Sequence, residues 1–137
     1  MAKDNHLAVL AASGIGVTEA IRTARARLPH TAHIEVEVDR FDQIEPVIAG
    51  GVDTIMLDNF SLDDLRRGVA AVAGRALVEA SGNVSLDTVA EIAATGVDVI
   101  SVGALTHGAR SLDLGLDVTV AADAATASGP DERSVHP

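Results

Sequence analysis

The feature of this chain that most constrains its fold is a repeating unit of about 20–22 residues. Each unit holds a short apolar run that suits a buried strand, followed by a longer amphipathic segment that suits a helix. The predicted strands cover residues 34–38, 54–57, 75–79 and 97–102. Because parallel strands need a crossover connection that is usually a helix, the pattern predicts an α/β fold of repeated βα units with parallel strands.

Helices are predicted between these strands from apolar periodicity and capping residues. They cover residues 17–28, 41–49, 62–72 and 85–94. Ser61 with Asp64 predicts a capped start for the third helix, and Ser85 is interpreted as the cap of the fourth. Pro46 predicts an irregular start for the second helix. Residues 6–12 are interpreted as a strand or as the end of one.

The length sets the domain organisation. Four or five βα units are about half of a closed (β/α)₈ barrel, which takes about 250 residues. The sheet is therefore either open or part of a larger barrel. We expect one domain over residues 3–120 and a disordered tail over residues 121–137, where small and polar residues follow no period.

Composition narrows the classes of function. The net charge of −10 disfavours nucleic acid and anionic membranes as partners, and two phenylalanines without Trp or Tyr offer no platform for stacking bases. The absence of cysteine excludes disulfides and thiolate chemistry. Without a run of about 18 apolar residues or a signal-peptide pattern, we expect a soluble cytoplasmic protein.

Polar residues and glycines end the predicted strands. Glu37, Asp58, Ser81 and Gly103 follow four successive apolar runs. Because the carboxyl ends of parallel strands lie at one edge of the sheet, where active sites of such folds are found, we expect these residues to face one site. Taken singly, they also suit solvated carboxylates and ordinary turns, and the spacing alone leaves that alternative open.

Five short motifs occur in the order and spacing of a known family. They are K-D-N-H at residues 3–6, E-V-E-V-D at 35–39, L-D-N-F at 57–60, E-A-S-G-N at 79–83 and S-V-G-A-L-T-H at 101–107. Together they resemble nicotinate-nucleotide pyrophosphorylase (carboxylating), also called quinolinate phosphoribosyltransferase. The resemblance covers only the C-terminal part of that family's barrel. It implies a truncated chain, without the N-terminal domain, the early strands and the basic cluster that binds quinolinate, and hence one inactive alone.

The resemblance implies an enzyme of the glycosyltransferase (pentosyltransferase) class. Its reaction joins quinolinate to 5-phosphoribosyl-1-pyrophosphate, releases pyrophosphate and CO₂, and gives nicotinate mononucleotide for NAD biosynthesis. It further implies Mg²⁺ as cofactor and a homodimer for the full-length family. The transition state needs carboxylates near the positively charged ribose ring, cations at the pyrophosphate, and backbone N–H groups at the 5′-phosphate.

Residue roles follow from the same resemblance. Glu37 and Asp58 would hold the ribose hydroxyls and help to place Mg²⁺ indirectly, and Lys3 would reach the pyrophosphate; these three are the catalytic candidates. The predicted substrate-binding residues are Lys3, Glu37, Asp58, Ser81, Gly82, Asn83, Gly103 and His107. For Lys3 the alternative is a mobile solvated charge near the chain end, and for His107 a plain loop histidine.

Two other functions stay open at this stage. One is a paralogous enzyme of the same fold with another ring acceptor, such as the paralogue linked to molybdenum transport genes. The other is a non-catalytic half-barrel that associates through its exposed sheet edges. Acceptor choice depends on the missing basic cluster, so the sequence does not separate the first alternative from the main hypothesis.

Overall fold

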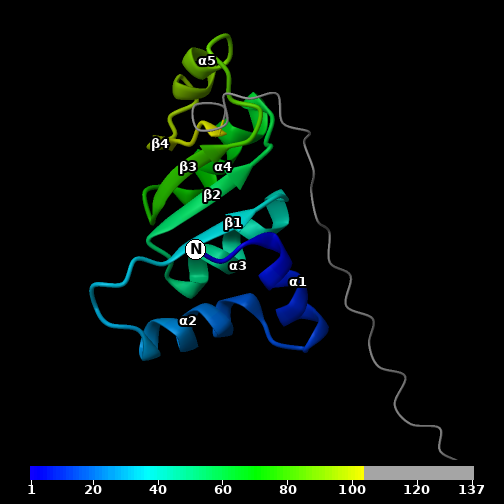
Figure 1. Ribbon diagram of the computed structural model, residues 1–137, viewed down its shortest axis with the longest axis vertical. Helices are drawn as coiled ribbons and strands as arrows, with labels where there is room; N and C mark the ends of the chain where they lie inside the picture. The colour runs from blue at the N-terminus through cyan, green and yellow to red at the C-terminus, as the bar shows by residue number, and fades with distance from the viewer. Residues whose placement is uncertain (104–137) are drawn as a thin grey trace, which may run out of the picture.

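The computed structural model describes residues 1–103, shown in colour in Figure 1. Their elements are α1 (Asp4–Ala12), α2 (Val17–Arg27), β1 (Glu35–Val38), the 3-10 helix η1 (Phe41–Gln43), α3 (Ile44–Gly50), β2 (Thr54–Asp58), α4 (Leu62–Val72), β3 (Leu77–Ser81), α5 (Val89–Ala93) and β4 (Val99–Ile100). The predicted tail over residues 121–137 lies outside the described residues.

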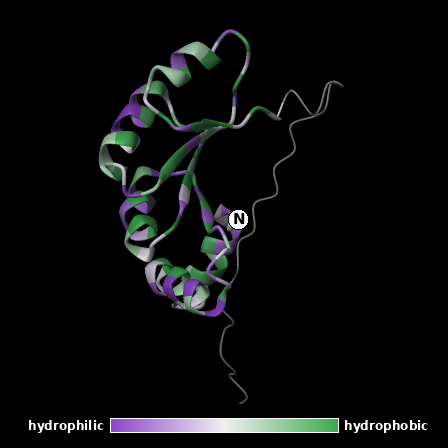
Figure 2. Cartoon of the chain, turned by 90° about the vertical axis from the view of Figure 1, so that its left-hand side faces the viewer, coloured by the Kyte–Doolittle hydropathy of each residue, from purple (hydrophilic) through white to green (hydrophobic). Residues whose placement is uncertain are grey.

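The four strands form one parallel sheet in chain order, β1-β2-β3-β4, which confirms the predicted α/β fold of βα units. One face of the sheet is apolar and buried, and Figure 2 shows the helices gathered along one side. Side chains of that core, none more than 1% exposed, include Val36, Val38, Ile55 and Leu57. The register aligns Glu37, Met56 and Glu79 in a row, so the opposite face carries the carboxylates.

The N-terminal segment differs from its prediction. Residues 6–12 are not a strand, because they belong to helix α1. The extended residue is Ala2, which forms a parallel bridge with Val36: its N–H donates to Glu35 O, and its carbonyl accepts from Glu37 N–H, both at 2.8 Å. From Asp4 on, the chain is rich in Ala and Leu, which favour a helix once this short pairing ends. Figure 1 accordingly places the N-terminus beside β1.

Two helices agree with their predictions. α4 covers residues 62–72 as predicted, and the Ser61 side chain accepts a hydrogen bond from Asp64 N–H at 3.2 Å. α3 begins irregularly, since the 3-10 turn η1 precedes it and Pro46 occupies its third position. A proline there costs no hydrogen bond, because the first N–H groups of a helix have no partner within it.

Three other boundaries are corrected by local hydrogen bonds. α5 begins at Val89 and Ser85 is not its cap, because Ser85 N–H donates to Thr88 Oγ1 at 2.9 Å and closes a separate turn. β3 begins two residues late, because Arg75 N–H donates to Val72 O at 3.1 Å and so belongs to the turn after α4. β4 is shorter than residues 97–102, since only two of its residues pair with β3.

A Gly-Val-Asp sequence directly precedes both β2 and β4, and its aspartate makes the same pair of hydrogen bonds at each. Asp53 N–H donates to Ile34 O at 2.9 Å, while Ile34 N–H donates to the Asp53 carboxylate at 2.6 Å. Asp98 makes the same reciprocal pair with Val78, with both distances 2.8 Å. The hydrogen bond from Ile34 N–H, and after it the Arg25 guanidinium at 2.5 Å, hold the pKa of Asp53 below its usual value.

Among the described residues no single helix is long and apolar enough to span a membrane. The bent pair formed by residues 5–12 and 17–27, at 108° to each other, passes the same test of length and composition together. α2 also packs on α3 and buries Ile21 there.

Candidate functional site

The predicted site residues lie toward the carboxyl edge of the sheet. Asp58 and Ser81 end β2 and β3 and are register partners, and Glu37 is the next to last residue of β1. All three point to the face opposite the apolar core. Glu37 and Asp58 are one strand and two residues apart, which places their Cα atoms about 8 Å from each other. Gly103, the last described residue, follows β4 by three positions.

Lys3 joins this edge from the start of the chain. Its Nζ lies 3.6 Å from Glu37 Oε2, with the lysine side chain 53% exposed and the glutamate side chain 13% exposed. The bridge between Ala2 and Val36 brings Lys3 to this place, because it aligns the N-terminus with β1. The Lys3 N–H in turn donates to His6 Nδ1 at 3.1 Å, so the ring of His6 stabilises the first turn of α1. The structure thus unites two predicted catalytic residues, Lys3 and Glu37.

The loops after β2 and β3 are tied to each other by Asn59. Its Nδ2 donates to Asp58 Oδ2 at 2.8 Å, and its Oδ1 accepts from Asn83 Nδ2 at 3.0 Å. Its backbone N–H donates to Ser81 O at 2.9 Å. Sequence reasoning assigned a role to Asp58, Ser81 and Asn83 but missed Asn59. The signal for it was an asparagine directly after a strand, where the left-handed conformation suits this residue type.

Gly82 lies against Asn59 in the same pair of loops. Its φ is +82°, and a Cβ built on it would lie 2.6 Å from Asn59 Cγ and 2.9 Å from Asn59 N. A side chain at this position is therefore excluded both by the backbone conformation and by space. The glycine of the S-G-N motif lets the two loops approach closely, and it leaves backbone N–H groups near the edge of the sheet.

Besides Glu37 and Asp58, the polar face of the sheet carries the carboxylate of Glu79. Glu79 is 8% exposed and pairs with Met56, so it lies two strands away from Glu37 in the same row. It accepts a hydrogen bond from the Ser101 hydroxyl, which ties β3 to the segment after β4. Sequence reasoning included Glu79 in a motif without a role, since its burial depends on the neighbouring strands.

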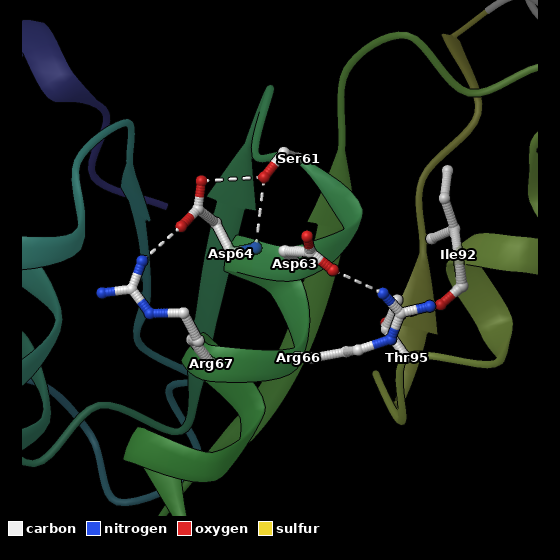
Figure 3. Close-up of polar contacts among 7 residues, drawn as sticks. All are labelled: Ser61, Asp63, Asp64, Arg66, Arg67, Ile92 and Thr95. Atoms are coloured by element: carbon white, nitrogen blue, oxygen red, sulfur yellow. Dashed lines mark hydrogen bonds and ion pairs between the residues drawn. The ribbon is translucent and has the colours of Figure 1, made fainter.

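The first turn of α4 supports the loop that carries Asp58. Figure 3 shows Ser61 and Asp64 joined to each other, with Asp64 also paired to Arg67 at 2.7 Å. The Arg67 guanidinium carbon in turn lies 4.4 Å from the centre of the Phe41 ring. Through this chain of contacts, α4 connects the end of β2 to the segment that follows β1.

A groove of about 580 Å³ lies beside this edge. Residues of α1 and residues 14–17 form part of its wall, and Asp39, Arg40 and Asp42 form another part. Of the predicted site residues within residues 1–103, none lines this groove. The candidate site at the strand ends is therefore separate from this groove.

Magnesium was predicted at Glu37 and Asp58. Within residues 1–103 there is no group of three or more His, Asp or Glu side chains placed to hold a metal ion alone. Two carboxylates on one face of neighbouring strands nevertheless suit Mg²⁺, which is commonly held by one or two carboxylates together with substrate phosphates and waters. His107 lies outside the described residues, so its role stays a prediction.

Comparison with known proteins gives one consistent result. The family described as "Quinolinate phosphoribosyl transferase, C-terminal domain" matches residues 1–117. The chain is 38% identical over 120 residues to the probable nicotinate-nucleotide pyrophosphorylase (carboxylating) of Bacillus subtilis, covering 88% of this chain and 40% of that protein. It is 42% identical over 119 residues to the nicotinate-nucleotide pyrophosphorylase (carboxylating) of Mycobacterium leprae, covering 85% and 40%.

Solved structures show the same similarity. NadC from Streptococcus pyogenes superimposes with a TM-score of 0.69 at 43% identity, covering 82% of this chain and 38% of that one. The nicotinate-nucleotide pyrophosphorylase from Francisella tularensis gives a TM-score of 0.67 at 39% identity, covering 77% and 36%. The chain thus spans about 40% of the length of the curated relatives it matches.

Proposed function

Because this chain belongs to the quinolinate phosphoribosyltransferase family, matching its C-terminal domain, we propose that the carboxyl edge of its sheet binds 5-phosphoribosyl-1-pyrophosphate. One observation carries the proposal: Lys3 with Glu37, and Asp58 with Asn83 through Asn59, lie at the ends of three neighbouring parallel strands. In the whole protein this half-site would serve the transfer of phosphoribosyl to quinolinate, with release of pyrophosphate and CO₂ and formation of nicotinate mononucleotide.

The charges at the edge suit the chemistry of that transfer. When the bond from ribose C1 to the pyrophosphate oxygen breaks, positive charge grows on the ring, and the Glu37 and Asp58 carboxylates stabilise it. The Lys3 ammonium offers a countercharge to the leaving pyrophosphate, and its pairing with Glu37 keeps it at the edge of the sheet. The loop of Ser81 and Gly82 offers backbone N–H groups to the 5′-phosphate.

We propose that Glu37 and Asp58 would also help to place Mg²⁺ without ligating it directly, as suits an ion that keeps several waters and binds substrate phosphates. When bound, the ion supplies positive charge where negative charge develops on the leaving group. The same carboxylates would then act both toward the ribose ring and toward the ion.

Calorimetric titration of the chain with phosphoribosyl pyrophosphate and Mg²⁺ tests the proposal. We expect saturable binding that Asp58→Asn weakens at least tenfold. Asp63→Asn, a carboxylate 90% exposed on α4, is the matched control and leaves binding unchanged. Protein concentration comes from refractometry, because the chain has no Trp or Tyr. Flat heats from a folded sample, or equal binding by the Asp58 variant, would refute the proposed site.

We further propose that the whole protein is a homodimer in the cytoplasm. The resemblance of the sequence to this family, which implies a homodimer for the full-length protein, supports association. The multiply charged donor, which does not cross an apolar bilayer unaided, supports the location. Light scattering and cell fractionation test these two points.

A further inference from the structure

Asn59 has an unusual concentration of contacts for an exposed residue. Its backbone N–H, its side-chain amide and its side-chain carbonyl each bond to a different residue, namely Ser81, Asp58 and Asn83. The orientation of the amide is determined by these partners, because a carboxylate only accepts hydrogen bonds and Nδ2 must therefore face Asp58. Oδ1 then faces Asn83, whose Nδ2 donates.

Backbone conformation holds Asn59 in this position. Its φ is +56°, and Asn83 has a φ of +52°, so both asparagines are left-handed residues at the ends of adjacent strands. Between them, Gly82 leaves no space for a Cβ beside Asn59. The left-handed turn directs the Asn59 side chain across to the neighbouring loop, where an ordinary strand-to-helix turn would leave it in water.

We propose that Asn59 is a positioning residue that couples the two halves of the donor site. It holds the Asp58 carboxylate, which faces the ribose, in register with the loop of residues 81–83, which faces the 5′-phosphate. The inference rests on the proposed binding of phosphoribosyl pyrophosphate and adds a residue to it. A ligand that spans both halves gains from their fixed separation, because less ordering is left for the moment of binding.

The coupling distinguishes two kinds of ligand. Phosphoribosyl pyrophosphate spans both halves, so its affinity depends on their relative position. Inorganic phosphate occupies only the loop of residues 81–83, so its affinity does not. If Asn59 only held the fold of the two loops together, its loss would lower the affinity for both ligands by the same factor.

The test uses Asn59→Gly in the full 137-residue chain. Glycine keeps the positive φ and the backbone N–H bond to Ser81 but removes both side-chain bonds. Ala73→Gly, at the end of α4 with a φ of +52°, is the matched control, since it makes the same kind of replacement at a left-handed residue away from the site. Binding is followed by backbone amide chemical shifts, which report millimolar as well as micromolar dissociation constants.

We expect Asn59→Gly to weaken the binding of phosphoribosyl pyrophosphate about tenfold in the presence of Mg²⁺. This is the order expected for loss of one charge-assisted hydrogen bond. The affinity of Asn59→Gly for inorganic phosphate should change less than twofold. Ala73→Gly should change the affinity for neither ligand.

Three outcomes would overturn the inference. Equal weakening of both ligands would show a structural role only, and unchanged affinity for phosphoribosyl pyrophosphate would show that the side chain has no role. Absence of binding by the unchanged chain would instead remove the proposed function itself, and the inference with it.

Discussion

Gly82 is the position where a single added methyl group should do the most damage to the site. Its φ of +82° disfavours any residue with a Cβ by about 1–2 kcal/mol. The added Cβ would also lie 2.6 Å from Asn59 Cγ and 2.9 Å from its backbone N, and overpacking of this kind costs typically about 1–3 kcal/mol. Gly82→Ala should therefore lower the free energy of unfolding by about 2–5 kcal/mol.

Gly74→Ala separates the two contributions. Gly74 has a φ of +71°, but a Cβ built there meets nothing within 4 Å, so this variant carries the conformational cost without the clash. Urea unfolding followed by far-ultraviolet circular dichroism measures both variants, since the chain has no tryptophan to report fluorescence. A stabilising osmolyte keeps the weaker variant folded at zero urea if needed.

We expect the free energy of unfolding of the Gly82→Ala variant to lie below that of the Gly74→Ala variant by about 1–3 kcal/mol. Equal stabilities of the two variants would refute the argument, because they would show that the loops after β2 and β3 do not pack as closely as the structure has them. The Gly82 variant should in addition lose phosphoribosyl pyrophosphate binding, whereas the Gly74 variant should retain it.

Three further predictions concern other parts of the chain. Gly50→Ala should lower the free energy of unfolding by about 1–3 kcal/mol in urea unfolding, because its Cβ would lie 2.7 Å from Ile21 Cβ where α3 meets α2. Gly16→Ala is the comparison, since a Cβ there meets nothing within 4 Å and the φ is −66°, and equal losses would contradict the packing argument. Asp53 has a pKa below its ordinary 3.8, so its contribution to stability is complete above that pH and is lost as the pH falls through the lowered pKa. In urea unfolding at a series of pH values, Asp53→Asn should therefore reduce the loss of unfolding free energy at acid pH, and Asp63→Asn should not. Lys3→Gln should lower the affinity for phosphoribosyl pyrophosphate several-fold at low salt and less at high salt, as expected for a half-exposed charge. A loss of affinity that does not depend on salt would contradict an electrostatic role.

The sequence predicted those parts of the fold that depend on local pattern. The boundaries of α4 follow from an amphipathic run behind a serine cap, and β2 follows from a short apolar run ended by Asp58. The start of α1 could not be predicted in this way, because the pairing of Ala2 with Val36 joins segments more than thirty residues apart. The shortened α5 depends on one side chain, Thr88, which occupies backbone groups that a longer helix would use.

The site was predicted in the same uneven way. Periodicity and motifs indicated Glu37, Asp58 and Ser81 as residues at strand ends, and the register gives them a common face. The closeness of Lys3 to Glu37 depends on the position of the N-terminus, and the bonds of Asn59 depend on two left-handed turns. Such features come from tertiary contacts and from φ angles that a motif does not specify.

The most direct test of the account is a map of backbone amide shifts during titration of the chain with phosphoribosyl pyrophosphate and Mg²⁺. The account predicts that the largest shifts among the described residues fall at the carboxyl edge, at Lys3, Glu37, Asp58, Ser81, Gly82 and Asn83. The opposite edge of the sheet, with Asp53 and Asp98, should stay unchanged. Shifts confined to the groove beside Arg40, or to that opposite edge, would contradict the assignment of the donor site.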